Sequence, residues 1–202
     1  MNVQLTGHEI EQFVTSRLVA RRLLPADLDF LTALHAEAAV MATRGGVRSA
    51  ASTEPFVRSN VAHWRRYQFG LYVISLADNP DEPIGRAGLR WTGHPRPSPW
   101  AETDGTESPA VDLSVILVPS VWEQGLGTEA AQALLAIGDR LGLPIVAGCE
   151  HDHWPAVSLA TRVGLIRAGG YTHHNRPWVR FRWPAGGAPP VAIDTGDNEE
   201  QR

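Results

Sequence analysis

The 202-residue sequence contains no lysine, and all eighteen of its basic side chains are arginine. This absence excludes the phosphate-binding loop of P-loop nucleotide hydrolases, because the GxxxxGK[ST] signature requires a lysine. We interpret the arginine-only usage as a compositional bias and not as a binding signature. A broad basic face is also missing, since the formal net charge is −4 and much of the acidic excess lies near the two ends of the chain. A nucleic-acid partner is therefore not expected.

Cysteine and long hydrophobic runs are equally scarce. Cys149 is the single cysteine, which excludes an internal disulfide framework and a cysteine-based metal cluster. We expect it to be a small core residue. The apolar runs are much shorter than the roughly 18 residues that a membrane helix needs, and the N-terminus lacks the basic and apolar segments of a signal peptide. We therefore expect a soluble, cytoplasmic protein with no membrane partner.

The rest of the composition is typical of one folded domain. Hydrophobic residues make up 43% of the chain and charged residues 20%, which suits a single globular domain with a substantial core. No repeat of about 20 to 50 residues is present, which excludes solenoids and propellers. We assign residues 15–183 to this domain and residues 1–14 to an N-terminal extension. Residues 184–202, rich in proline, glycine and acidic side chains, are predicted to be a disordered tail.

Hydrophobic periodicity and turn residues predict a mixture of helices and strands. An edge or half-exposed strand over residues 16–24 precedes a helix that Pro25 opens and whose apolar face extends to Ala38. A second helix is expected from the cap residues of STEPF to about Gln68. The later elements are predicted as a hairpin (71–77 and 83–91), a long loop (92–110), a strand (111–118), a helix (128–142), a strand (144–150), a helix (154–163) and two last strands (165–171 and 177–183). Because the hairpin must be antiparallel, the predicted fold class is α/β or α+β, with a mixed sheet and helices on both faces.

The stretch VWEQGLGTEA (121–130) places two glycines where an apolar strand gives way to a helix. At such a junction several backbone N–H groups have no partner within the helix and point toward one place, which attracts an anion. The absence of Cβ at Gly125 and Gly127 would let a phosphate approach the main chain, and Thr128 could add a hydroxyl donor. A purely structural turn is an equally good interpretation of this segment alone. The dinucleotide-binding GxGxxG pattern fails, because Ala130 stands at its third glycine position.

Four segments together resemble the GNAT N-acetyltransferases, in particular the branch of ribosomal-protein N-terminal alanine acetyltransferases. VDLSVILVPSVWEQGLGTEAAQALL is similar to the central strand, phosphate loop and helix of that branch, and TSRLVARRLLPADLDFL to its opening strand and helix. PIGRAGLR is similar to its third strand, and HWPAVSLATRVGL to its later helix. The four segments follow one another in the family's order over about residues 15–183.

The resemblance implies a mixed, V-shaped sheet whose fourth and fifth strands splay apart and admit acetyl-CoA, the acyl-donor substrate. Pantetheine would pair with the backbone near Leu117 and Val118 in the manner of an added strand. Trp122 heads the loop in place of the family's usual glutamine or arginine, so the loop would depend mainly on main-chain donors. The CoA diphosphate would bind the N–H groups of Glu123, Gln124, Gly125, Leu126, Gly127 and Thr128.

Other departures from the family pattern fall on the later helix. His153 stands where the family commonly has an asparagine that contacts the cofactor, and Ala156 stands where a serine is common. The tyrosine that many members use as the acid toward the leaving thiolate would fall at Ala160. The resemblance therefore implies His153 as a cofactor contact and leaves the role of the tyrosine vacant or filled from elsewhere.

Acetyl transfer from a thioester to an amine needs a neutral amine, and a carboxylate or a histidine can act as the base. Asp112 is one candidate, at a position where the branch often has a glutamate; a solvent-exposed aspartate at the start of a strand is the alternative. Glu150 and His151, which follow the predicted strand 144–150, are the other candidates, with an ordinary polar loop as the alternative. The run from Glu150 to His153 also suggests a metal site, but four consecutive residues cannot converge on one ion, so no metal is expected.

The acceptor site is predicted at His173 and His174, where the family often closes the acceptor pocket, and Trp91 could line it; a solvated loop and a core tryptophan are the alternatives. The predicted function is acetyl-CoA-dependent N-acetylation of a primary amine, on a protein N-terminus or a small molecule, by direct transfer. Alternatives are a longer acyl-CoA or aminoacyl-tRNA as the donor, and a non-catalytic acyl-CoA-binding module. A homodimer is left open.

Overall fold

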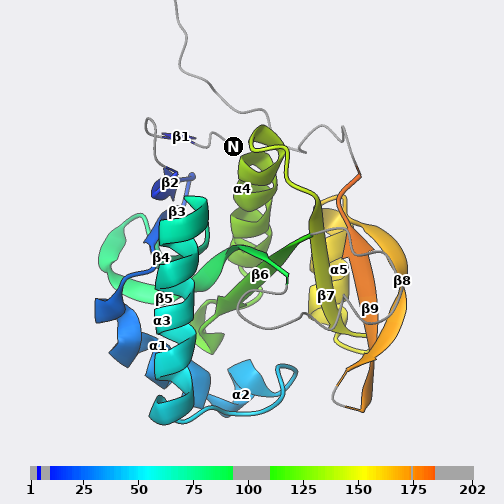
Figure 1. The fold of residues 1–202 in the computed structure, drawn as a ribbon, viewed down its shortest axis with the longest axis horizontal. Helices are drawn as coiled ribbons and strands as arrows, with labels where there is room; N and C mark the ends of the chain where they lie inside the picture. The colour runs from blue at the N-terminus through cyan, green and yellow to red at the C-terminus, as the bar shows by residue number, and fades with distance from the viewer. Residues whose placement is uncertain (1–3, 6–9, 93–109, 174, 185–202) are drawn as a thin grey trace, which may run out of the picture.

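The computed structural model of the chain describes residues 4–5, 10–92, 110–173 and 175–184 (Figure 1). His174, most of the predicted loop at 92–110 and all but the first residue of the predicted tail at 184–202 lie outside these ranges. In the described part of the chain, no helix is long and apolar enough to cross a membrane.

One mixed sheet runs through the molecule. Among the described residues it has nine strands in the order β1-β2-β3-β4-β5-β6-β7-β9-β8. All neighbouring strands are antiparallel except β6 and β7, which are parallel, so the predicted mixed sheet is confirmed. The strands are β1 (Gln4–Leu5), β2 (Gln12–Val14), β3 (Leu18–Arg22), β4 (Leu71–Leu76), β5 (Asn79–Trp91), β6 (Val111–Leu117), β7 (Ile145–Glu150), β8 (Ile166–His173) and β9 (Arg176–Arg182).

Helices cover both faces of this sheet, as predicted (Figure 1). The helical elements are η1 (Pro25–Asp27), α1 (Leu28–Ala36), α2 (Ala38–Met41), α3 (Ala50–Tyr67), η2 (Pro119–Val121), α4 (Leu126–Arg140) and α5 (Trp154–Arg162). On one face, Leu31 of α1 and Val57 of α3 share a buried cluster with Ile116 of β6. On the other face, Leu134 of α4 and Ala160 of α5 belong to the larger core cluster.

The N-terminal segment extends the sheet beyond the predicted domain. β3 was expected to be an edge or half-exposed strand, but it lies between β2 and β4. Phe13 of β2 is completely buried, and its ring packs edge-on against Tyr72 with the centroids 5.0 Å apart. The Tyr72 hydroxyl also donates to Ile10 O at 2.6 Å. This aromatic anchor explains why residues 10–14 join the sheet.

The helix boundaries near Glu37 and Ser49 differ from the prediction. The first helix does not continue to Ala38, because Glu37 is extended (φ −72°, ψ 113°) and Ala38 begins the separate α2. α3 begins before the STEPF segment, because Ser49 caps it by accepting the N–H of Ser52 at 3.3 Å. α3 ends at Tyr67, one residue before the predicted Gln68, whose left-handed φ of 60° stops the helix.

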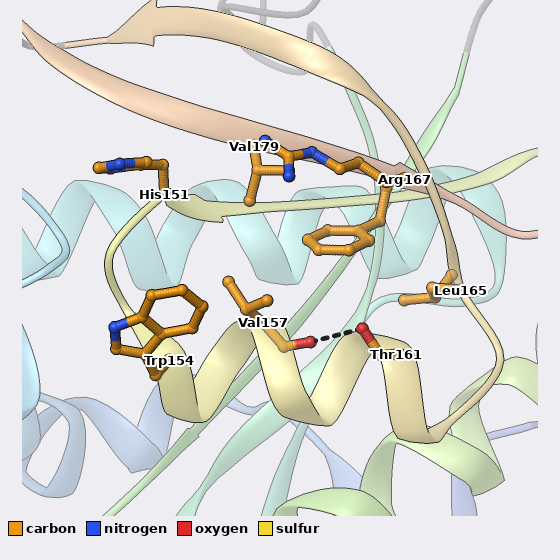
Figure 2. Close-up of a pocket in the computed structure, with 8 residues that line it drawn as sticks. His151, Trp154, Val157, Thr161, Leu165, Arg167 and Val179 are labelled. Atoms are coloured by element: carbon orange, nitrogen blue, oxygen red, sulfur yellow. Dashed lines mark hydrogen bonds between the residues drawn. The ribbon is translucent and has the colours of Figure 1, made fainter.

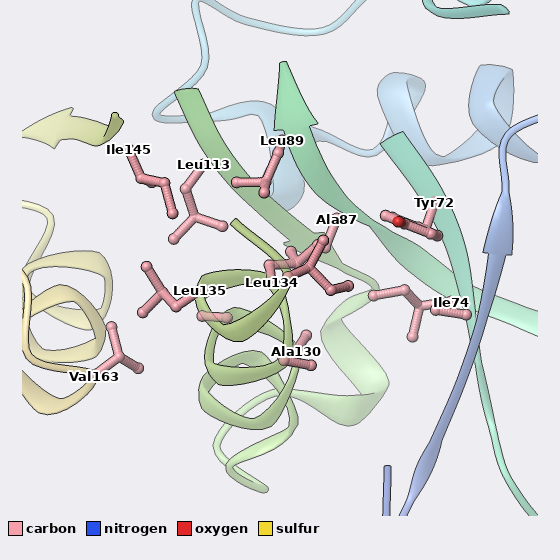
Figure 3. Close-up of a cluster of buried hydrophobic side chains, with 14 of the residues drawn as sticks. Tyr72, Ile74, Ala87, Leu89, Leu113, Ala130, Leu134, Leu135, Ile145 and Val163 are labelled. Carbon is pink, nitrogen blue, oxygen red and sulfur yellow. The ribbon is translucent and has the colours of Figure 1, made fainter. Parts of the chain in front are cut away.

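The main core lies between α4 and the middle strands. Figure 3 shows Leu134 and Leu135 of α4 close to Leu89 and Leu113 of the sheet, and all four side chains belong to one buried cluster. Cys149 of β7 belongs to the same cluster, which confirms it as a core residue. Burial raises the pKa of its thiol to about 11, so the thiol stays protonated at neutral pH.

Candidate active site

β6 and β7 separate soon after they begin. They pair at only two positions, Val111 with Ile145 and Asp112 with Val146, although both strands continue well beyond them. Figure 1 shows the two strands diverging from this point. The predicted splay of the fourth and fifth strands of the domain is therefore confirmed.

The backbone of β6 directs hydrogen-bonding groups toward this splay. Val111 N donates to Pro144 O at 2.8 Å, so its N–H points toward the β7 side. Because backbone groups alternate in direction along a strand, those of Leu113, Val115 and Leu117 point the same way. We call these three residues the splay edge. β7 does not pair with this edge, and such an edge can accept an extended, amide-containing chain.

The structure separates the two residues that were predicted to pair with pantetheine. Leu117 belongs to the splay edge, although its carbonyl already accepts from Trp122 Nε1 at 2.7 Å. Val118 N donates to Ile84 O of β5 at 2.8 Å, on the side away from the splay. Because backbone groups alternate in direction along β6, the splay-edge residue Val115 takes the place of Val118 as a candidate partner of pantetheine.

α4 begins at a left-handed glycine. Gly125 is the N-cap residue with φ 78°, a conformation that strains a residue with a Cβ. The N–H groups of residues 126–128 have no partner within the helix and lie at the positive end of its dipole. The exposed Glu123 and Gln124 complete the loop, and Glu123 also has a positive φ of 61°. This geometry suits an anion.

At Gly127, close packing and not a left-handed φ requires the absence of a side chain. A Cβ there would lie 3.2 Å from Leu159 Cδ1 of α5 and 3.9 Å from Val115 Cγ1 of β6. Its missing side chain thus allows α4 to pack closely against these elements, whereas the sequence suggested the approach of a phosphate. The Leu126 side chain is buried in the core, so only its main chain could contact a ligand, and Thr128 is half-buried.

A buried carboxylate fixes the start of α4. Glu129 is 1% exposed and accepts hydrogen bonds from Thr15 Oγ1 at 2.6 Å and Ser16 Oγ at 3.0 Å. It also accepts from the backbone N of Arg17 at 3.0 Å and from Arg17 Nε at 2.7 Å. Burial raises the pKa of Glu129, but these hydrogen bonds outweigh burial and hold the pKa below its usual value. The turn between β2 and β3 is thereby tied to α4.

Arg17 adds a basic side chain to the loop that the sequence pattern did not predict. Its Nη1 donates to Gln124 O at 2.8 Å, and its Nη2 would lie 3.5 Å from a Cβ at Gly125. One feature of the sequence could have indicated such a basic partner, the glutamate of GTEA (Glu129). An acidic side chain in the first turn of a buried helix needs hydrogen-bond donors. The donor lies 112 residues earlier in the chain, so the sequence alone did not identify it.

A polar face lies on the side of β6 away from α4. Ile116 packs in the cluster of α1 and α3, so Asp112 and Ser114 face the same side by strand alternation. Arg90 stands opposite Asp112 in β5, and Arg86 stands opposite Ile116. Side chains opposite one another in an antiparallel pair share a face. The sheet therefore separates these groups from α4 and its N-terminal loop.

Asp112 lies where the splay begins, since its pairing with Val146 is the last before the strands separate. Burial raises the pKa of Asp112 to about 6, although Arg44, Arg90 and Arg86 act to lower it. A carboxyl group with this pKa is present in both protonation states near neutral pH, as proton transfer requires. Its catalytic role stays a prediction.

Glu150 ends β7 on the same face as Asp112, because it follows Val146 at the strand period of two. Its side chain is 4% exposed, and Arg176 Nη1 lies 2.8 Å from Oε2. His153 caps α5 and is half-buried, and its pKa is lowered mainly by burial. Among the described residues, no His, Cys, Asp or Glu cluster could hold a metal.

His151 does not lie with Asp112 and Glu150; it lines a pocket elsewhere (Figure 2). This pocket is lined by His151, Trp154, Val157, Thr161, Leu165, Arg167, Val179 and Phe181. Val179 pairs with Cys149, so it faces away from Glu150. The structure therefore brings Asp112 and Glu150 to one face and leaves His151 apart from them.

The structure also places the predicted acceptor residues in different surroundings. Trp91 packs against Phe69 with ring centroids 6.1 Å apart, and it contacts the core on the α4 side, away from Asp112. This supports its alternative as a core tryptophan, so we leave Trp91 out of the candidate site. His173 packs edge-on against Trp178 at 5.2 Å, and Trp178 stands opposite Glu150. His173 therefore remains a candidate at the rim, whereas His174 lies outside the described residues.

Sequence reasoning missed two further groups on this face. Tyr171 stands opposite Trp178 and is 9% exposed, and burial raises the pKa of its hydroxyl above its usual value. Arg44, from the segment after α2, reaches β6 with its Nη2 3.4 Å from Val115 O. Neither residue lies in a recognisable motif, because only the tertiary fold brings it to the splay.

A family model agrees with this geometry. The model described as an acetyltransferase (GNAT) domain matches residues 17–166.

Solved structures share the fold. A GNAT-family acetyltransferase of Bordetella pertussis, described as putative, has a TM-score of 0.72 at 20% identity and covers 85% of this chain and 98% of its own. RimL, a ribosomal L7/L12 α-N-protein acetyltransferase solved with coenzyme A, has a TM-score of 0.65 at 18% identity and covers 90% and 97%. An aminoglycoside acetyltransferase, also solved with coenzyme A, has a TM-score of 0.65 at 19% identity and covers 82% and 94%.

Proposed function

Since the chain belongs to the GNAT acetyltransferase family, we propose that it transfers an acetyl group from acetyl-CoA directly to a primary amine. The observation that carries this proposal is the combination of the splay edge with the left-handed Gly125 at the start of α4. The first offers main-chain groups to an extended chain, and the second offers N–H groups to an anion.

Acetyl-CoA has the chemistry that these two features need. Its pantetheine arm is extended and contains two amides, which would pair with the splay edge as an added strand does. Its diphosphate would bind the N–H groups of residues 126–128, with Arg17 beside them. The two CoA complexes among the similar structures support this donor.

The proposed reaction is a single acyl transfer. The amine nitrogen loses a proton to a base and attacks the thioester carbonyl, so that a C–N bond forms and the C–S bond breaks. Asp112 is our candidate base, because it lies where the splay begins and titrates near neutral pH. The thiolate of CoA then takes up a proton, for which Tyr171 is our candidate donor because strand register places it on the face of Asp112 and Glu150. Cys149 is not a nucleophile in this scheme, since its thiol is buried and protonated.

The direct test is thiol release from acetyl-CoA in the presence of an amine panel. The panel contains peptides with free N-termini, polyamines, aminoglycosides and small amino acids, and mass spectrometry identifies the acetylated product. Release that depends on an amine supports the proposal. Tight binding of acetyl-CoA without turnover on any acceptor would favour a non-catalytic acyl-CoA-binding module. Turnover only with a longer acyl-CoA would change the donor.

A further inference from the structure

Four arginines gather on the face that carries Asp112. Arg86 and Arg90 belong to β5, and Arg44 and Arg48 belong to the segment between α2 and α3. We call these four residues the arginine cluster. The segment is held in place because the backbone N of Arg48 donates to His35 O at 2.8 Å.

Arg86 is the most buried member of the arginine cluster, with 6% of its surface exposed. Its Nε donates to His35 Nε2 at 3.2 Å, and its guanidinium carbon lies 4.8 Å from the centre of the Phe56 ring. Burial, with Arg86 and Arg48, lowers the pKa of His35 to about 3, so this histidine is neutral and accepts the hydrogen bond. Neither contact supplies a negative charge.

The arginine cluster therefore carries excess positive charge. In the part of the chain that the structure describes, the ion pairs join other arginines, or His151, to acids, and none includes a member of the cluster. Asp112 is the carboxylate in electrostatic reach of both Arg86 and Arg90. Burial, together with the other members, lowers the pKa of Arg86 well below its usual value. Like charges around the buried Arg86 are costly, and a bound anion would relieve that cost.

This anion is not the diphosphate of acetyl-CoA. The N-terminus of α4 lies on the opposite face of the sheet, because α4 packs on Leu113 and Leu117 whereas the cluster shares its face with Ile116. An anionic group that reaches the cluster would instead lie beside Asp112, where the acceptor amine is expected.

We infer that the acceptor is a primary amine that also carries a carboxylate or a phosphate, with its anionic group bound by the arginine cluster and its amine directed to Asp112. This inference rests on the acetyl transfer proposed above and names the substrate class of the same site. The planar guanidinium matches both oxyanions through paired hydrogen bonds, and Asp112 would attract the ammonium form of the amine before it loses its proton. One sheet face would thus recognise both charges of a dipolar acceptor.

Matched acceptor pairs test this inference on the full chain. Glycine is compared with glycinamide, and phosphoethanolamine with ethanolamine, by thiol release from acetyl-CoA, with rates expressed per neutral amine. We expect kcat/KM to be about tenfold or more higher for the anionic member of at least one pair, as charge-assisted hydrogen bonds imply. The pair that shows the preference distinguishes a carboxylate from a phosphate. Equal or faster reaction of the neutral members in both pairs would overturn the inference.

Arg90→Gln is the main variant, because Arg90 is half-buried and its loss is less disruptive than that of Arg86. We expect the preference for the anionic member to collapse in Arg90→Gln and to recover partly in Arg90→Lys. Arg58→Ala, on the exposed surface of α3, should retain the full preference. A preference that survives in Arg90→Gln and in Arg44→Gln would show that these arginines do not bind the anion.

A binding assay separates this inference from the function on which it rests. If acetyl-CoA binds and no amine releases thiol, the proposed acetyl transfer fails, and ligand-induced thermal shifts then decide the inference alone. A rise in melting temperature with glycine or phosphoethanolamine that is absent in Arg90→Gln would support it. No rise with either compound would refute it.

Discussion

At the scale of single residues, the candidate site depends more on charge and backbone conformation than on recognisable sequence motifs. Asp112 is one of several candidate bases in the sequence, and burial raises its pKa to about 6, above the ordinary 3.8. Gly125 belongs to a recognisable GxG pattern, but its importance comes from φ 78°. The pKa of Asp112 and the backbone conformation of Gly125 therefore lead to separate predictions.

The first prediction concerns Asp112→Asn. If Asp112 accepts the proton of the amine, kcat/KM should fall as the pH drops through about 6, because the protonated carboxyl cannot act as a base. The variant should lose this inflection and react about a hundredfold or more slowly. Asp78→Asn, in the exposed turn between β4 and β5, is the control. An inflection near pH 6 that persists in Asp112→Asn would assign the titration to another group.

The same pKa predicts the pH dependence of stability. Because the folded-state pKa of Asp112 is above the unfolded value, the folded protein binds more protons between about pH 4 and pH 6. The contribution of Asp112 to the free energy of unfolding is therefore most favourable at the acidic end and is lost as the pH rises through about 6. As the pH rises across this range, the free energy of unfolding measured with urea should decline less in Asp112→Asn than in the wild type. Parallel curves would contradict the raised pKa.

A third prediction compares two left-handed glycines. Gly125→Ala and Gly142→Ala both place an alanine at positive φ, 78° and 63°, and each should cost about 1 to 2 kcal/mol of stability. Gly125 begins α4 beside the proposed diphosphate site, whereas Gly142 lies just beyond the other end of the helix. Calorimetry should show weaker acetyl-CoA binding for Gly125→Ala only. Equal affinities in the two variants would argue against a phosphate at this loop. Gly127 is a poorer test, because its substitution also disturbs packing against Leu159.

At the scale of elements, the start of α4 depends on the turn between β2 and β3. Glu129 and Arg17 join these elements, and Arg17 also holds the carbonyl of Gln124 in the loop. Neither residue contacts the proposed reacting atoms, so both act by positioning the loop. The helix dipole alone would therefore not account for the proposed anion site, because the loop must also be held in its left-handed conformation.

Glu129→Gln tests this coupling. The amide cannot accept all four hydrogen bonds as well as the carboxylate does, so we expect a loss of about 1 to 3 kcal/mol in the free energy of unfolding. We also expect a higher KM for acetyl-CoA, while the preference between anionic and neutral acceptors is kept. Glu54→Gln, which removes an exposed pair with Arg58 on α3, should change neither quantity measurably. An unchanged KM in Glu129→Gln would restrict the network to a structural role.

At the scale of the whole molecule, β6 and β7 join two parts of the sheet through only two paired positions. The strands β1 to β6 lie on one side of this junction, and β7, β9 and β8 lie on the other. An extended ligand in the splay would add hydrogen bonds where the sheet has none between these strands. Binding should therefore stabilise the molecule as a whole.

Hydrogen exchange measured by NMR can locate this effect. On addition of CoA, amide exchange at one or more of Leu113, Val115 and Leu117 should slow by more than the general stabilisation of the sheet accounts for. Val118 provides the internal control, because its N–H is already bonded to Ile84 on β5. Protection that appears equally at Val118 and at the splay edge would indicate global stabilisation without strand addition.

The sequence by itself determined the order of elements from β3 onward, apart from the short α2, together with the strand-to-helix loop and the family. These features rest on neighbouring residues: the hairpin at DNPDE, the alternation of VDLSVILV and the glycines of VWEQGLGTEA are all local. The end of α3 was predicted to within one residue, at about Gln68. The break between α1 and α2 and the start of α3 were not predicted, because the extended Glu37 and the Ser49 cap compete with stronger nearby signals.

Only the tertiary structure decided which side chains share a face. Trp91 and Asp112 are both candidates in the sequence, but strand register sends the first to the core and the second to the arginine cluster. Arg17 lies 112 residues from Glu129, and Arg44 lies 71 residues from Val115. No local pattern encodes such pairs, because they form only when the register of the sheet and the packing of the helices are fixed together. The arginine-only composition, interpreted from sequence as a bias, thus gains a proposed role through the position of four of its members.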